Sequence, residues 1–140
     1  MKKVLFGLLV LGAMASCKKD KNNSCESTVA GIAGSYKITK ITAVIPNFPD
    51  QDVTTTFATD CERNGVYQLK SDKTVTYTES GSCSDSGTGT WDIVDNKMTV
   101  TTDGGSLDYS STPITSWDCT TFVLSQDGGG VTYKVYFTKQ

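Results

Sequence analysis

Regular interruption of short strand-forming runs is the feature that most limits what this chain can fold into. Beyond Gly34, segments rich in Thr, Val, Tyr and Ile are cut about every six to ten residues by Gly, Asp, Asn or Pro. β-branched and aromatic residues favour extended strands, and the interrupting residues favour tight turns. No window places apolar residues at helical spacing over three turns, so we expect little helix. The sequence therefore predicts an all-β, antiparallel domain.

The runs define nine candidate strands joined by short connections. They lie near residues 35–45, 52–58, 65–70, 73–79, 88–94, 97–102, 105–111, 119–126 and 130–138. Eight or nine short strands in chain order are typical of an up-and-down meander that closes into a small barrel. An open β-sandwich is the alternative architecture, but it needs longer crossover connections than this chain offers.

Turn sequences predict the registers of the hairpins. At Asp95-Asn96 both residues tolerate the positive φ of a two-residue turn, which would pair Trp91 with Val100. The same reasoning at the other turns predicts three further pairs, namely Leu69 with Thr74, Val100 with Leu107 and Leu124 with Tyr133. In the first strand the apolar positions change parity near Thr39-Lys40, which predicts either a bulge there or burial of both faces.

The first residues have the composition of an export signal. Lys2 and Lys3 precede an apolar run at Val4–Leu11, about half the length of a membrane span, and small residues follow it. The end of this segment, Met14-Ala15-Ser16-Cys17, resembles the lipobox of bacterial lipoproteins. An ordinary signal peptide with an accidental cysteine is the alternative interpretation.

The lipobox resemblance implies that Cys17 becomes a diacylated N-terminus that anchors the chain in a membrane. Lys18 rather than Asp follows the cysteine, which for lipoproteins of this kind implies sorting to the outer membrane, with either face open. The expected organisation is a signal peptide over residues 1–16, a lipidated flexible tether over 17–30 and a β-barrel domain over 31–140.

Four further cysteines indicate two disulfides, because exported proteins fold in an oxidising environment. A two-residue turn at Ser71-Asp72 brings position 61 opposite position 82, so we expect Cys61 to pair with Cys83. Cys25 and Cys119 are then left to each other, unless Cys25 lies in the tether and pairs between molecules. A zinc site is disfavoured, since histidine is absent and no C-x2-C or C-x4-C pair occurs.

Charge and composition exclude several classes of function. From Cys25 onward fourteen Asp or Glu residues outnumber eight Lys or Arg, and this acidic body disfavours nucleic acid as a partner. The chain has no histidine and no nucleophile motif, so its sequence does not support acid–base or covalent catalysis. Carboxylates at Asp60, Glu62 and Asp118, and at Asp50 and Asp52, are better explained as solvated surface charges than as glycosidase or calcium groups. We therefore expect a monomer that is not an enzyme and needs neither a cofactor nor a metal.

Several motifs resemble those of the small lipocalin-like domains of Gram-negative lipoproteins. Gly34-Ser35-Tyr36 stands where lipocalins carry G-x-W, with Tyr in place of Trp. Cys61 leads into a hairpin, Cys83 follows it, and a G-x-W strand begins at Gly89-Thr90-Trp91. The resemblance covers about residues 31–140 and implies a barrel that binds a small apolar or amphipathic ligand.

Aromatic residues on the inward parities either fill the core or line a ligand site. If a ligand enters, the residues expected near it are Tyr36, Trp91, Tyr109 and Tyr133. The competing function is that of a packed barrel acting as a structural module, or as an interaction module for envelope proteins or surface glycans. An interior void open at one end would favour ligand binding, whereas a filled interior would favour interaction.

Membrane attachment is predicted to depend on Cys17, since two or three acyl chains give stable anchoring where one is marginal. A Cys17→Ser variant should leave the membrane fraction and lose metabolic labelling with palmitate, while the wild-type chain keeps both. Retention of label and of membrane fractionation by the variant would contradict the anchor.

Overall fold

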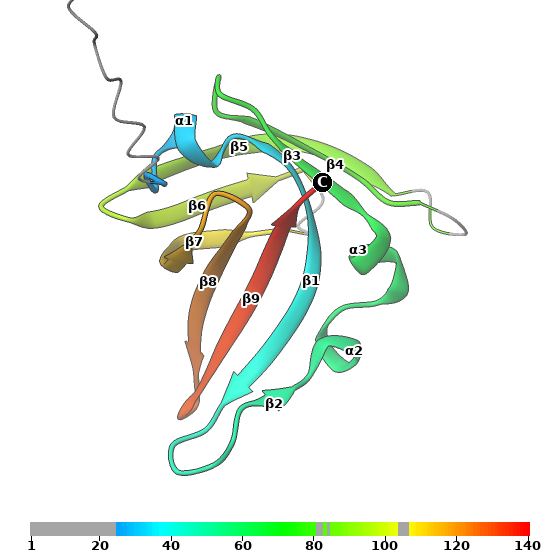
Figure 1. Ribbon diagram of the computed structural model, residues 1–140. Coiled ribbons are helices and arrows are strands. Elements are labelled where there is room, and N and C mark those ends of the chain that lie inside the picture. The colour runs from blue at the N-terminus through cyan, green and yellow to red at the C-terminus, as the bar shows by residue number, and fades with distance from the viewer. Residues whose placement is uncertain (1–24, 81–82, 84, 104–106) are drawn as a thin grey trace, which may run out of the picture.

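The computed structural model describes residues 25–80, 83, 85–103 and 107–140. The expected signal peptide, Cys17 and the tether up to residue 24 lie outside the described residues. Nine strands form a single antiparallel sheet, and β9 pairs back with β1 (Figure 1). The strands are β1 (Gly34–Val44), β2 (Gln51–Asp52), β3 (Val66–Leu69), β4 (Thr74–Thr78), β5 (Ser86–Val94), β6 (Lys97–Thr102), β7 (Tyr109–Trp117), β8 (Thr121–Gly128) and β9 (Val131–Lys139).

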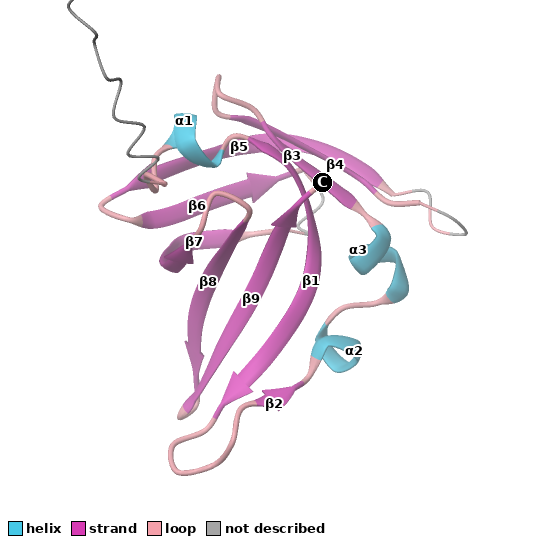
Figure 2. Cartoon of the chain, viewed as in Figure 1, coloured by secondary structure: helices cyan, strands magenta, loops and turns pink. Residues whose placement is uncertain are grey.

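Eight strands, β1 and β3 to β9, make the closed barrel, and β2 is an additional two-residue strand that pairs with β1. This confirms the predicted all-β, up-and-down barrel. The described helices are short, as Figure 2 shows: α1 (Val29–Ile32) precedes β1, while α2 (Thr54–Phe57) and α3 (Asp60–Asn64) lie between β2 and β3.

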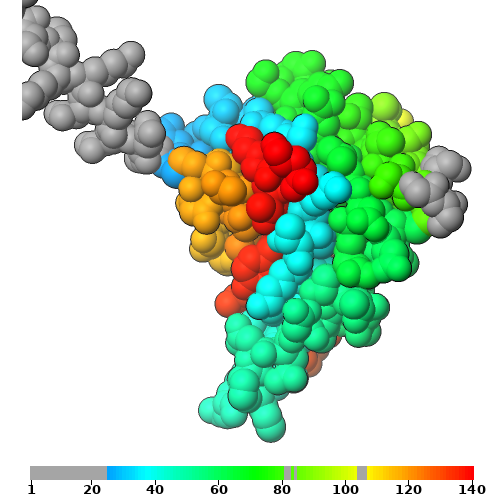
Figure 3. Space-filling view, turned by 45° about the vertical axis from the view of Figure 1, so that its right-hand side comes forward, coloured from blue at the N-terminus to red at the C-terminus, as the bar shows by residue number. Residues whose placement is uncertain are grey.

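Because neighbouring strands are antiparallel, alternate connections lie at the same end of the barrel. We call one end the capped end; it holds α1 and the β3–β4, β5–β6 and β7–β8 turns. We call the other end the mouth; it holds the β1–β3 connection with α2 and α3, and the β4–β5, β6–β7 and β8–β9 connections. Figure 3 shows β1 and β9 side by side on the surface, with the segment through β2 and α2 below them.

One predicted register is confirmed in full. Trp91 pairs with Val100 across the Asp95-Asn96 turn, and the two turn residues have φ values of 50° and 58°. The bulge predicted in the first strand is also present, because the β1–β9 register shifts between Ile38 and Lys40.

The other three registers were wrong because the connections have different lengths from those expected. They pair Leu69 with Val75, Val100 with Tyr109 and Leu124 with Val135. In the β8–β9 hairpin, β8 runs on to Gly128, and the turn needs only Gly129 and Gly130, at φ 62° and 88°. These left-handed conformations favour glycine, which explains the position of the turn.

The strand expected over residues 52–58 is also wrong, since the strand there consists of Gln51–Asp52 alone and α2 follows it. Asp52 Oδ1 accepts hydrogen bonds from the backbone N–H (3.0 Å) and the hydroxyl (2.6 Å) of Thr54. The Thr54 Oγ1 in turn accepts from the backbone N–H of Ile41 at 2.8 Å. These bonds favour helix initiation at α2 over a Thr-rich strand.

The capped end is closed by α1 and by buried aromatic side chains. Tyr36 is fully buried, and its hydroxyl donates to the backbone carbonyl of Ile32 at 2.5 Å. Burial raises the pKa of Tyr36 to about 12, so the hydroxyl stays protonated and keeps this bond. Trp91 is likewise buried, and its Nε1–H donates to the carbonyl of Lys70 at 2.8 Å.

One disulfide lies at each end of the barrel. Cys25 pairs with Cys119 in the β7–β8 turn, with Cα atoms 5.2 Å apart. Cys61 of α3 pairs with Cys83 of the β4–β5 connection, with Cα atoms 5.8 Å apart. Both pairings are those expected from the sequence. Residues 25–30, part of the expected tether, are thereby joined to the barrel, and Val29 packs against its core.

Removing each disulfide should destabilise the barrel according to the length of chain that it closes. The sequence separations are 22 residues for Cys61–Cys83 and 94 for Cys25–Cys119. Chain entropy then gives losses of about 3 and about 5 kcal/mol for the corresponding double Cys→Ala variants. Urea unfolding measures both losses, and peptide mapping without reduction verifies the pairs. Equal stability of both variants and the wild type would contradict this account.

Candidate functional site

The interior of the barrel is filled by side chains. The cavity at its centre has a volume of about 10 Å³, room for a single water molecule. It is lined by Tyr36, Tyr67, Leu69, Met98, Val100, Leu107, Tyr109, Phe122, Leu124 and Phe137. Stacking of Phe122 on Phe137, with ring centroids 4.8 Å apart, closes this region tightly. A small-molecule ligand therefore has no room at the centre.

A larger hollow lies at the mouth, which we call the mouth groove. Its volume is about 340 Å³, within the range of small-molecule sites. The strands and α2 contribute its lining at their mouth ends, namely Ile41, Phe57, Tyr109, Gln126, Asp127, Gly128, Tyr133 and Val135. The groove is thus mainly apolar and aromatic, with two polar side chains from the end of β8.

An aromatic pair forms one wall of the mouth groove. The rings of Phe57 and Tyr133 have centroids 5.0 Å apart and planes inclined by 59°. Phe57 remains 54% exposed, a large exposure for a Phe side chain. A Cβ atom at Gly128 would lie 3.4 Å from Cε2 of Tyr133, an ordinary van der Waals contact, so the end of β8 lies against this ring. The wall therefore depends on α2, β8 and β9 together.

Tyr109 forms the floor of the groove. Its side chain lines both the central cavity and the mouth groove, so it lies between them. The ring contacts Phe137 edge-on, with centroids 6.1 Å apart. Burial, and secondarily the nearby Glu62 carboxylate, raise the pKa of Tyr109, so its hydroxyl is protonated at physiological pH.

The four aromatic residues singled out from the sequence lie in two places. Tyr109 and Tyr133 meet at the mouth groove. Tyr36 and Trp91 are 0% and 2% exposed, and each donates its polar hydrogen to a backbone carbonyl. The structure therefore brings together one pair of the four and leaves the other pair buried in the closed part of the barrel.

Sequence reasoning missed Phe57, the most exposed aromatic residue of the groove. We missed the role of Phe57 because a strand over residues 52–58 gives its side chain no reason to contact β9. A signal was present in Thr59 and Glu62, which form the capping box of α3. Together with Asp52 and Thr54, this motif indicates helical turns rather than a strand.

The lipocalin-like domain is the family whose model matches this sequence, over residues 32–124. The chain belongs to this family. The match runs from the last residue of α1 into β8 and includes Phe57 and Tyr109. Searches of curated proteins and of solved structures each returned no significant match.

Lipocalin-like domains are typically non-catalytic, and in this one Asp60, Glu62 and Asp118 have structural roles. Asp60 pairs with Arg63 within α3, and Glu62 accepts from the backbone N–H of Thr59 at 2.7 Å. Asp118 accepts from the backbone N–H groups of Thr120 and Thr121 at 2.8 and 2.6 Å. The two disulfides, together with the fold, favour an extracytoplasmic location.

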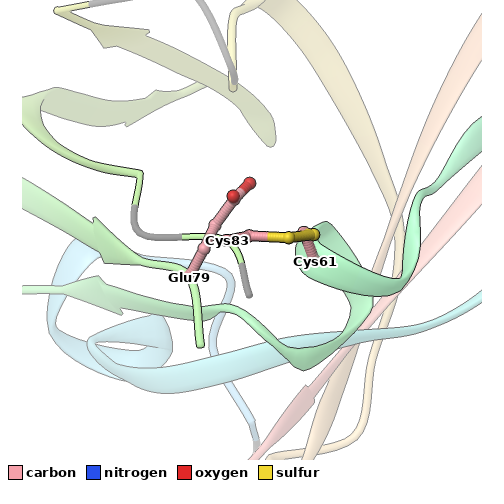
Figure 4. Close-up of side chains that lie close together, drawn as sticks. All are labelled: Cys61, Glu79 and Cys83. Carbon is pink, nitrogen blue, oxygen red and sulfur yellow. A yellow bond between two sulfur atoms is a disulfide. The ribbon is translucent and has the colours of Figure 1, made fainter. Parts of the chain in front are cut away.

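One cluster of metal-ligating residue types occurs in the described part of the lipocalin-like domain. Its members, Cys61, Glu79 and Cys83, have ligand atoms within 4.8 Å of one another (Figure 4). Both sulfur atoms are joined in the disulfide, so they offer no thiolates to a cation. The cluster is therefore a structural link at the mouth. Among the described helices, none has the length and apolar composition to span a membrane.

Proposed function

We propose that this chain is an envelope lipoprotein whose lipocalin-like domain binds a small apolar or amphipathic molecule in the mouth groove. The observation that carries the proposal is the groove of about 340 Å³, walled by Phe57 and Tyr133, at one end of an otherwise filled barrel. Its apolar lining with few polar groups is typical of sites that recognise small molecules.

The filled interior limits the size of the ligand. Because Tyr109 separates the groove from a central cavity of only about 10 Å³, the ligand stays at the mouth. A long acyl chain would have no space along the barrel axis. A compact molecule with one or two rings fits better, since Phe57 and Tyr133 provide aromatic contacts.

The proposed anchor at Cys17 would hold the barrel by its capped end. Cys25, the first described residue, is fixed to the β7–β8 turn at that end. The eight Cα-to-Cα steps from Cys17 to Cys25 span at most about 29 Å when fully extended. The mouth groove, at the opposite end, would then face away from the anchoring membrane and take its ligand from the aqueous side.

A second candidate function is that of an interaction module for envelope proteins or glycans. The filled interior favours it, as does Phe48, whose side chain is 67% exposed on the β1–β2 connection at the mouth. Exposed aromatic residues at one end of a barrel are also a feature of protein-binding surfaces. Ligand binding is preferred because the groove has a defined volume, whereas Phe48 lines no part of it.

Titration with the neutral fluorescent probe N-phenyl-1-naphthylamine distinguishes the two functions. We expect saturable binding to the wild type and a loss of about tenfold in affinity, roughly 1.4 kcal/mol, for Phe57→Ala and for Tyr133→Ala. Phe48→Ala is the matched control, since it removes an exposed Phe at the mouth that lies outside the groove. Equal losses for Phe48→Ala and Phe57→Ala, or no saturable binding, would favour the interaction module.

A further inference from the structure

Acidic side chains are concentrated at the mouth. Nine of the fourteen Asp or Glu residues from Cys25 onward belong to its connections or the strand ends beside them, namely Asp50, Asp52, Asp60, Glu62, Glu79, Asp85, Asp103, Asp108 and Asp127. The sequences of the four connections contain a single basic residue, Arg63, which is paired with Asp60. The mouth of this barrel therefore carries a strongly negative potential.

Most of the basic residues of the barrel lie elsewhere. Lys70, Lys73 and Lys97 are in or beside the capped-end turns, and Lys139 ends β9 there. Lys40 of β1 and Lys134 of β9 are neighbours in sequence of residues that line the groove, but neither lines it, and the Nζ of Lys40 lies over the ring of Tyr136, 5.8 Å from the centroid. Among the described residues, the lining of the mouth groove includes no Lys or Arg side chain.

Within the groove, Asp127 supplies a carboxylate at the rim. Its Oδ1 accepts from the Thr132 hydroxyl at 2.6 Å, which fixes the side chain beside the β8–β9 turn. Its Oδ2 receives no hydrogen bond from the described residues and is available to a ligand. The pKa of Tyr109 is raised mainly by burial and further by the Glu62 carboxylate, so a negative charge also acts on the floor of the groove.

The aromatic wall complements this charge. The faces of Phe57 and Tyr133 carry partial negative charge and attract cations positioned over them. A carboxylate at the rim and two aromatic rings in the wall together recognise a positively charged nitrogen attached to an apolar body. The same arrangement repels the carboxylate of a fatty acid.

We propose, resting on the ligand-binding function above, that the mouth groove selects organic cations: small amines or quaternary ammonium compounds with an aromatic or compact apolar body. Shape selection comes from the filled interior beneath Tyr109. Charge selection comes from Asp127 in the groove and from the acidic connections around it.

A series of ligands that differ only in the head group tests this selection. The series is 2-phenylethylammonium, 2-phenylethanol and phenylacetate, measured as competitors of the neutral probe at low ionic strength. The cation should bind about tenfold or more tightly than the anion, with the alcohol between them, and added salt should reduce the spread. Asp127→Asn should selectively weaken the binding of the cation. Asp95→Asn, a matched change in the β5–β6 turn at the capped end, should leave all three affinities unchanged.

The outcomes separate the two proposals. Equal binding of the three compounds, or tightest binding of phenylacetate, would overturn charge selection and leave the ligand-binding groove standing. Loss of cation preference in Asp95→Asn and its retention in Asp127→Asn would also overturn it. Failure of the probe and of all three compounds to bind saturably would overturn both the selection and the groove.

Discussion

The structure depends on the pairing of β1 with β9, because this pairing turns an open meander into a barrel. β1 pairs with β9 from Tyr36 to Val44, while its first residues also pair with β3 and its last residues with β2. β3 and β2 pair with the two ends of one edge of β1, and β9 pairs with its other edge. The bulge between Ile38 and Lys40 re-aims the side chains of β1 between its two halves. Closure removes the exposed sheet edges and creates an inside for the aromatic residues to fill.

The aromatic side chains fill the barrel only up to a certain point along its axis, and the position of this point determines what the domain can bind. Aromatic contacts link Tyr36, Phe122 and Phe137 through the barrel, and Tyr109 marks their limit at the mouth. Beyond Tyr109 the strands continue toward the mouth, but core side chains no longer fill the space between them. Phe57 of α2 forms one wall of this space. The groove is therefore a property of the connection between β1 and β3, held near the β4–β5 connection by Cys61–Cys83.

The sequence predicted the architecture better than its details, for identifiable reasons. Parity and turn residues define strands, so the barrel and the bulge followed; the Asp95-Asn96 register followed because both residues favour positive φ. The other three registers were predicted wrongly because the sequence defines the lengths of those turns less clearly. Parity also shows which side chains point inward but not how far along the axis they lie. Tyr36 and Tyr133 are thus alike in sequence, although only Tyr133 reaches the groove.

The central claim is that a ligand binds at the mouth and leaves the filled interior undisturbed. NMR of protein labelled at its Phe, Tyr and Trp rings tests this most directly, during titration with the neutral probe. The account predicts that shift changes concentrate on Phe57, Tyr109 and Tyr133, while Tyr36, Trp91 and Phe122 stay unmoved. Changes centred on the buried rings of the capped end, or on the outer faces of the strands, would contradict it.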